Sequence, residues 1–142
     1  MNSTIEKFGY PVTLIKEFDH WIVLLRPAQV TFGSLVLAAK NHATAYGDLP
    51  RASFAEQGLV IAAIEQALQR LTGYRRINYL MLMMIDPNVH LHVIPRYDGS
   101  HQWNGRDFPD AGWPGPPKLD TAIKLDDAEI ASLRDELIDI FR

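Results

Sequence analysis

The sequence predicts an α+β fold in which an antiparallel sheet of about five strands is covered by two helices. Three observations support it: polar and apolar residues alternate strictly over 88–96, short β-prone runs precede that stretch, and two segments have helical apolar spacing. The chain has 142 residues, 47% of them hydrophobic, which suits one domain with one core. We therefore expect a single domain over 1–142, with its core at about 12–97.

Composition excludes several classes of function. A net charge of −3 gives no support for nucleic-acid binding, which draws on an excess of Lys and Arg. The chain has no cysteine, so disulfides, thiolate catalysis and cysteine-based zinc sites are excluded. No apolar run of about 18 residues occurs, and residues 1–7 lack the basic and apolar regions of a signal peptide. We expect a cytoplasmic protein with no membrane partner.

The first half of the chain predicts a meander of short strands. Residues 12–18 and 20–25 are β-prone and flank Asp19, and 34–39 is a third such run after a turn-rich passage. Such short connections favour antiparallel neighbours. The later run 77–85 is apolar on both parities, which predicts a central strand that is covered on both sides.

Two helices are predicted from apolar spacing. Over 53–72 the apolar residues recur every three or four positions, Ser53 starts a capping box, and Gly73 is placed to end the helix. Residues 126–142 form the second helix, which carries most of the acidic excess opposite its apolar stripe. Between them, 98–125 is rich in Gly and Pro but also in Trp and Phe, so we expect an ordered, wrapping loop.

The alternating stretch 88–96 carries the candidate chemistry. On a strand, Asn88, His90 and His92 share one face, while Val89 and Leu91 point into the core. One imidazole can act as a nucleophile while its neighbour donates to a substrate oxygen, which suits phosphoryl or nucleotidyl transfer. Two other interpretations fit the spacing as well: a solvated strand face, and ligation of Zn²⁺ or Fe²⁺.

The residues around the two histidines distinguish these interpretations. Asn-Val-His-Leu-His-Val-Ile-Pro-Arg resembles the signature of the histidine triad (HIT) superfamily at six of seven positions. Its Pro95-Arg96 ending is similar to the fragile-histidine-triad branch of dinucleoside polyphosphate hydrolases. The departure is Asn88, which stands where that family has its first histidine, and the chain also lacks the Gly-Gln loop that precedes the triad in that branch.

The resemblance implies a HIT-like fold, a homodimer with nucleotide sites, and no metal or other cofactor. It makes His90 the nucleophile at an α-phosphate and His92 a donor to a phosphate oxygen, with Asn88 in the place of a helper histidine. Asn88 can form hydrogen bonds but cannot carry a positive charge. By position along the meander, Arg26 falls where the family binds ribose and Ser34 falls where it has a further histidine, while Arg96 shares the parity of His90 and is expected to attract anions.

The predicted function is hydrolysis or transfer at the α-phosphate of a nucleoside polyphosphate or phosphoramidate, through a covalent intermediate on His90. Two alternatives stay open. One is a nucleotide-binding protein with weak or lost catalysis, suggested by Asn88 and the missing Gly-Gln loop. The other is a small metalloprotein that uses both strand histidines and either His42 or His101.

Overall fold

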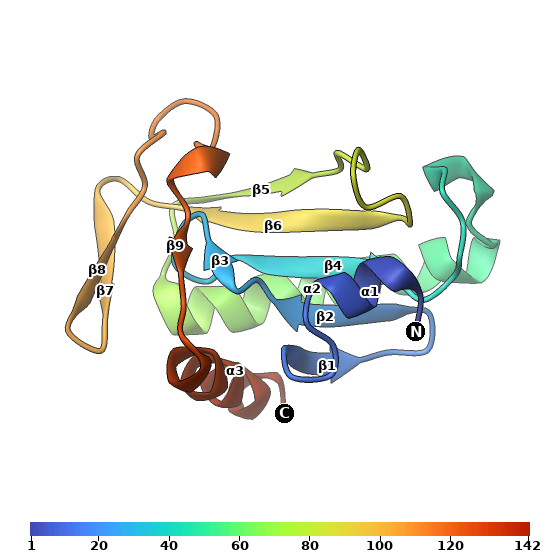
Figure 1. Cartoon of the computed structure of the whole chain (residues 1–142), viewed down its shortest axis with the longest axis horizontal. Coiled ribbons are helices and arrows are strands. Elements are labelled where there is room, and N and C mark those ends of the chain that lie inside the picture. Colours follow the sequence, from blue (N-terminus) through green and yellow to red (C-terminus); the bar gives the residue numbers. More distant parts are fainter.

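A five-stranded antiparallel sheet with strand order β1-β2-β4-β6-β5 is the centre of the fold (Figure 1). The computed structural model describes all residues from 1 to 142. The predicted α+β class and five-stranded antiparallel sheet are therefore confirmed, and the helices number three instead of two. The strands of this sheet are β1 (Leu14–Glu17), β2 (Trp21–Leu25), β4 (Leu35–Ala39), β5 (Arg76–Leu80) and β6 (His90–Arg96).

Helices cover both faces of the sheet. Apolar side chains of α2 (Arg51–Thr72) and α3 (Asp127–Phe141) form the main core with one face of β2, β4 and β6. The other face carries α1 (Ser3–Lys7), whose Ile5 packs in a smaller cluster with β2 and β4 (Figure 1). The sheet is thus covered on both faces. The face that carries the short helix α1 and the smaller apolar cluster is less covered and has room for a site. None of the helices combines the length and apolarity that a bilayer crossing requires.

Of the three helix ends that the sequence predicted, the structure confirms two. Gly73 ends α2 in the left-handed conformation, with φ 63°, and Asp126 begins α3 with the predicted capping box to Glu129. The predicted start of α2 at Ser53 is wrong. The helix begins at Arg51, after Pro50, and Ser53 is buried within its first turn. A proline immediately before the first turn loses no helical hydrogen bond, so the earlier start costs little.

The prediction of a central strand over 77–85 is wrong in two respects. β5 is an edge strand, paired only with β6, and it ends at Leu80. The chain leaves the sheet after Leu80, Met83 has a positive φ of 48°, and several apolar side chains on either side of Met83 are exposed. Apolar residues on both parities do not distinguish a central strand from an edge strand that continues into an apolar loop. The exposed fractions are 49% for Leu82, 85% for Met84 and 82% for Ile85.

The Gly- and Pro-rich segment after β6 contains regular structure. A hairpin of β7 (Ser100–Trp103) and β8 (Arg106–Pro109) is followed by a 3-10 turn, η2 (Leu119–Thr121), and by β9 (Ile123–Lys124). β9 pairs with β3 (Ala28–Gln29) in a separate two-stranded sheet, and so connects the segment to the chain between β2 and β4. A further 3-10 turn, η1 (Tyr46–Asp48), precedes α2. The hairpin contributes two aromatic side chains to the main core, Trp103 and Phe108.

Candidate active site

The two strand histidines lie on the sheet face that also carries α1. His90 pairs across the sheet with Ala38 and His92 pairs with Val36, both members of the smaller apolar cluster. Val89, Leu91 and Val93 point to the opposite face and belong to the main core. The alternation of β6 therefore separates the histidines from the core, as the sequence predicts.

The imidazoles are enclosed and do not form a solvated strand face. His90 is 2% exposed and His92 is 8% exposed. Their ring centroids are 5.1 Å apart, at an interplanar angle of 82°. The ring of Phe8, directly after α1, lies 5.4 Å from His90 and 5.6 Å from His92. The aromatic cover lowers the local dielectric, so charge on a bound group would interact strongly with nearby dipoles.

A small cavity gives access to both rings. Its volume is about 160 Å³, and it lies between the histidines and residues 82–86. These residues belong to the loop that connects β5 to β6 (Figure 1). Most of the loop residues that line it are apolar, apart from Asp86. A space of this size accepts a phosphoryl group with its oxygens, while a complete nucleotide would extend beyond it. The positive φ of Met83 shows that the loop is folded under local strain beside the cavity.

The backbone fixes which nitrogen of His90 is available. Nδ1 of His90 lies 2.8 Å from the carbonyl oxygen of Asn88. A carbonyl oxygen can only accept, so Nδ1 is the donor and the neutral ring carries its lone pair on Nε2. His90 also lines the cavity. The ring is thus held as a tautomer that has a nucleophilic nitrogen.

His92 is held as the complementary tautomer. Nε of Arg26 donates to Nδ1 of His92 at 3.4 Å, so the hydrogen of the neutral ring is on Nε2. Desolvation lowers the pKa of His92 from 6.5 to about 4, with smaller contributions from the charges of Arg26 and His90, while Asp86 acts in the opposite sense. His92 is therefore uncharged at neutral pH and can serve as a hydrogen-bond donor.

Asn88 is held by hydrogen bonds to two other parts of the chain. Its Oδ1 accepts a hydrogen bond from the Thr4 hydroxyl at 3.0 Å, and its Nδ2 donates to the carbonyl oxygen of His42 at 3.0 Å. Its backbone N–H also donates to Thr4 Oγ1. The side chain thus joins α1, the residues just before β6 and the loop after β4, and both ends of its amide are hydrogen-bonded.

Of the three other predicted binding residues, the structure brings only Arg26 to the histidines. The guanidinium is partly buried beside His92, is anchored on the carbonyl oxygen of Ala28, and has its pKa lowered by desolvation. Ser34 is fully buried, and its hydroxyl donates to the carbonyl oxygen of Thr31 at 2.7 Å. Arg96 lies at the other end of β6, roughly 13 Å from His92 by strand rise.

The residues proposed as a third metal ligand lie away from the pair. His42 is exposed, and the ring of His101 stacks on Phe32 with centroids 4.7 Å apart. No group of three His, Asp or Glu side chains has the geometry to hold a metal ion. A metal centre therefore has no support from the donor set around His90 and His92.

The sequence did not reveal Phe8 or the loop 82–86 as parts of the site. A signal for α1 was present: Asn2 caps the helix by accepting from the Ile5 backbone N–H at 3.0 Å, and Ile5 and Phe8 have helical spacing. The placement of Phe8 over the histidines depends on contacts more than 80 residues away in the chain, such as that between Thr4 and Asn88.

The lowered pKa of His92 predicts a pH-dependent stability. The folded state binds fewer protons than the unfolded chain between about pH 4 and 6.5, so the free energy of unfolding falls as the pH drops through this window. The expected loss is on the order of 2 kcal/mol. Urea unfolding of the parent and of His92→Gln at several pH values measures it. In His92→Gln the free energy of unfolding should depend less steeply on pH. Part of the dependence should remain because burial also lowers the pKa of His101. An unchanged pH dependence in the variant would show that His92 is not its source.

Comparisons with known proteins place this geometry in a known fold. No protein-family model matches the chain, and no curated protein does. Solved structures match over nearly the whole chain. A histidine triad protein from Bradyrhizobium japonicum superposes with a TM-score of 0.76 at 21% identity, over 100% of this chain and 97% of that one. One from Marinobacter aquaeolei gives 0.76 at 20% identity, over 99% and 94%.

A third match is described as a hypothetical histidine triad nucleotide-binding protein from Sulfolobus tokodaii. It has a TM-score of 0.73 and 15% identity, over 97% of this chain and 89% of that one. At these identities the likeness concerns the fold. The sheet and helices of this chain are arranged as in histidine triad proteins.

Proposed function

We propose that this chain is a histidine triad hydrolase or transferase that acts at the α-phosphate of a nucleotide, through a covalent intermediate on His90. One observation carries the proposal. Nδ1 of His90 donates to the carbonyl oxygen of Asn88, which leaves Nε2 as the nucleophilic nitrogen of a ring that lines a cavity. Structures of the same fold support it, one of which is described as nucleotide-binding.

The first step is attack on phosphorus. The Nε2 lone pair of His90 forms a bond to the α-phosphorus, and the bond from that phosphorus to the leaving group breaks with its electron pair going to the leaving atom. The ring then carries a positive charge, which the carbonyl oxygen of Asn88 stabilises through Nδ1–H. The product of this step is a nucleotidyl-histidine and a free leaving group.

The second step regenerates the enzyme. Water, or an acceptor hydroxyl in a transfer reaction, attacks the same phosphorus; the bond to Nε2 breaks, its electron pair returns to the ring, and the attacking oxygen loses its proton to solvent. Negative charge on the phosphoryl oxygens faces His92 and Arg26 in both steps. His92 offers Nε2–H, and Arg26, held on His92 and Ala28, supplies the nearby positive charge.

The surroundings of Asn88 restrict the leaving group. Both ends of its amide are bound to Thr4 and His42, and an amide cannot supply a proton to a departing atom. A phosphate or nucleoside phosphate leaves as an anion without protonation, whereas an amine from a phosphoramidate requires a proton. Within the predicted range of substrates, we therefore favour nucleoside polyphosphates, including the dinucleoside polyphosphates of the fragile-histidine-triad branch.

The covalent intermediate provides the direct test. The protein is mixed with a dinucleoside polyphosphate, quenched within milliseconds to seconds and digested under mildly alkaline conditions, which preserve a phosphorus–nitrogen bond. We expect mass spectrometry to find one nucleotidyl group on the peptide that contains His90, and none on that peptide in His90→Asn. A group attached elsewhere, in the parent and the variant alike, would overturn the assignment of the nucleophile.

A nucleotide-binding protein without turnover is the second candidate. The observation that favours it is the engagement of Asn88 with α1, which leaves no side chain at the first triad position to assist the leaving group. This candidate has the same ligand and the same contacts with His92 and Arg26. It differs in predicting that ligand is recovered unchanged and that His90 carries no adduct.

Homodimerisation is part of the proposal. β5 is an edge strand with one row of backbone hydrogen-bonding groups facing outward, and such an edge is a ready template for a second copy. The apolar side chains of the adjoining loop, Leu82, Met84 and Ile85, are also exposed. Light scattering during gel filtration is expected to give about twice the chain mass of 16.1 kDa.

A further inference from the structure

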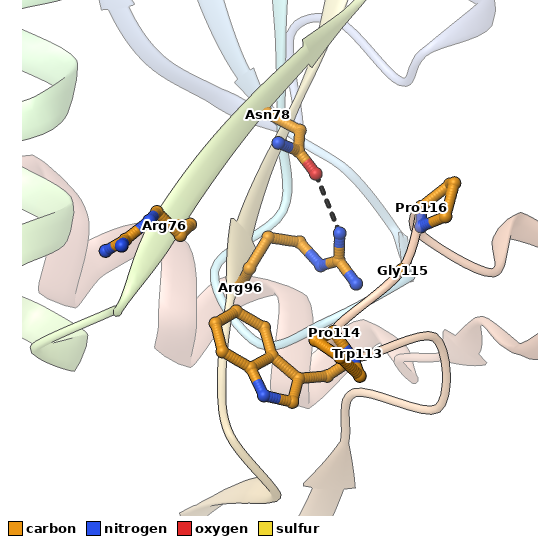
Figure 2. A pocket seen from close by; sticks show the side chains of 7 residues that line it. All are labelled: Arg76, Asn78, Arg96, Trp113, Pro114, Gly115 and Pro116. Atoms are coloured by element: carbon orange, nitrogen blue, oxygen red, sulfur yellow. Dashed lines mark hydrogen bonds between the residues drawn. The ribbon is translucent and has the colours of Figure 1, made fainter.

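The largest cavity lies at the opposite end of β6 from His92 and has no part in the proposed reaction. Its volume is about 540 Å³, within the range of small-molecule sites. Arg76 and Asn78 of β5 and Arg96 of β6 line one side, and the segment 113–116 lines the other (Figure 2). Because cross-strand partners share a face, Arg76 and Arg96 lie on the same side of the sheet as the histidines.

Arg96 forms the floor of this cavity and has donors to spare. It is 3% exposed; its Nε and Nη2 donate to the two oxygens of Asp110, and its Nη1 donates to Oδ1 of Asn78 at 2.7 Å. A guanidinium has five N–H groups, so two of the five have no acceptor in the protein. Figure 2 shows the guanidinium between Asn78 and the segment 113–116. A buried cation with free donors is a strong recognition element for an oxyanion.

The opposite wall is preformed. The Trp113 N–H donates to the carbonyl oxygen of Asp110 at 3.2 Å, and the Gly115 N–H donates to that of Gly112 at 2.7 Å. The fold is so tight that a Cβ on Gly112 would collide with the carbonyl oxygen of Pro116. The indole of Trp113 is held against the cavity by this segment, beside the Arg96 guanidinium (Figure 2). It offers a flat surface for a planar ring.

The charge of the cavity favours an anion. No Asp or Glu lines it, and the one nearby carboxylate, Asp110, is already occupied by Arg96 and by the Tyr97 N–H. Arg76 is exposed and has no acidic partner. Its guanidinium is directed away from Arg96 at the rim (Figure 2), where a change of rotamer brings it over an incoming ligand.

We propose that this cavity is a second ligand site, for a small molecule that joins a planar ring to a carboxylate or phosphate. The anionic group accepts hydrogen bonds from the two free N–H groups of Arg96 and from the side-chain N–H of Asn78, while the ring packs on Trp113. Because Arg96 is roughly 13 Å from His92 along the strand, the site is separate from the histidines and does not depend on the proposed reaction.

The test uses two probes, benzoate and phenyl phosphate, added to the ¹⁵N-labelled full-length protein. We expect the Trp113 indole N–H and the Asn78 side-chain amide to shift in a saturable manner, in the parent and in His90→Ala alike. A response to both probes establishes a general oxyanion site, and a response to one identifies its anion. Shifts confined to residues around His90, or no saturable shift with either probe, would overturn the proposal.

Asn78→Asp is the decisive variant, since Arg96 is too buried for its removal to be tested safely. Aspartate keeps the acceptor for Arg96 and places a negative charge in the cavity, so affinity for both probes should fall about tenfold or more. Trp113→Ala should weaken binding by a similar factor, followed on the Asn78 amide. Unchanged affinity in both variants would place the ligand elsewhere.

The adjacent arginines provide a matched control. Arg75, just before β5, and Arg76, its first residue, are both exposed, but only Arg76 lines the cavity. Arg76→Gln is expected to weaken binding about threefold, and Arg75→Gln, with the same change in net charge, to leave it unchanged. Equal losses in the two variants would mean that the probes respond to overall charge and not to this cavity.

Discussion

Replacing His90 by alanine is expected to reduce the turnover of a dinucleoside polyphosphate by about a thousandfold or more, because the proposed covalent route needs the Nε2 lone pair of this ring. Release of the mononucleotide, followed by chromatography, measures the rate. Binding of a non-hydrolysable analogue should change only a few-fold, since Arg26 and His92 retain their contacts with each other.

Two further histidine variants sharpen this result. His42→Ala is the matched control, because that side chain is exposed and its interaction with Asn88 uses the backbone carbonyl, which the variant keeps. Its turnover should equal that of the parent. His92→Asn should lose about a hundredfold, the scale associated with removing one donor to a developing oxyanion. Equal turnover in His90→Ala and the parent would end the proposal.

Asn88→His separates a slow enzyme from a protein that only binds nucleotide. It restores the residue that the histidine triad resemblance expects at the first position. A faster release of mononucleotide at unchanged affinity would show that the parent is an enzyme limited by proton supply to the leaving group. If neither the parent nor Asn88→His releases product, and His90 carries no adduct, the binding function is the correct one.

Asp110→Asn is expected to lower the free energy of unfolding by about 3–5 kcal/mol. The side chains of Arg96 and Asp110 are 4% and 1% exposed, and Asp110 accepts from Nε and Nη2 of Arg96 and from the Tyr97 N–H. An amide at position 110 removes the countercharge and turns an N–H toward the guanidinium, so that a buried cation loses its partner. Urea unfolding at neutral pH measures the loss.

A surface ion pair provides the comparison. Lys40 donates to Glu17 at 2.7 Å, with side chains 27% and 40% exposed, so Glu17→Gln should cost less than about 1 kcal/mol. The double variant Arg96→Met with Asp110→Leu should recover part of the stability lost in Asp110→Asn, because it leaves no unpaired charge. A loss in Asp110→Asn no larger than that in Glu17→Gln would show that the buried pair contributes little.

Local patterns in the sequence were sufficient for the central features of the fold and the candidate site. The alternation around His90 and His92 predicted which side chains leave the core, because a strand has a period of two whatever it packs against. The left-handed end of α2 at Gly73 and the capping box at Asp126 were predicted for a similar reason. Each depends on the chemistry of a few adjacent residues.

Long-range packing decided the rest. The run 77–85 was predicted as a central strand because it is apolar on both parities. That pattern does not show which strands lie beside it, and in the structure β5 is at an edge of the sheet. In the same way, Ser34 closes a turn with Thr31, and Arg96 is partnered by Asp110 in a segment that lacks any local pattern. These partners come together only in the folded structure.

The sequence by itself thus determined a strand with two histidines on one face of an antiparallel sheet, since periodicity and capping are properties of neighbours in the chain. Only the tertiary structure decided what encloses that strand: Phe8 over the two rings, the loop 82–86 beside them, and Arg26 on His92. The contacts of Phe8 and Arg26 join positions dozens of residues apart, and the free energy that selects among such pairings comes from burial of the whole molecule.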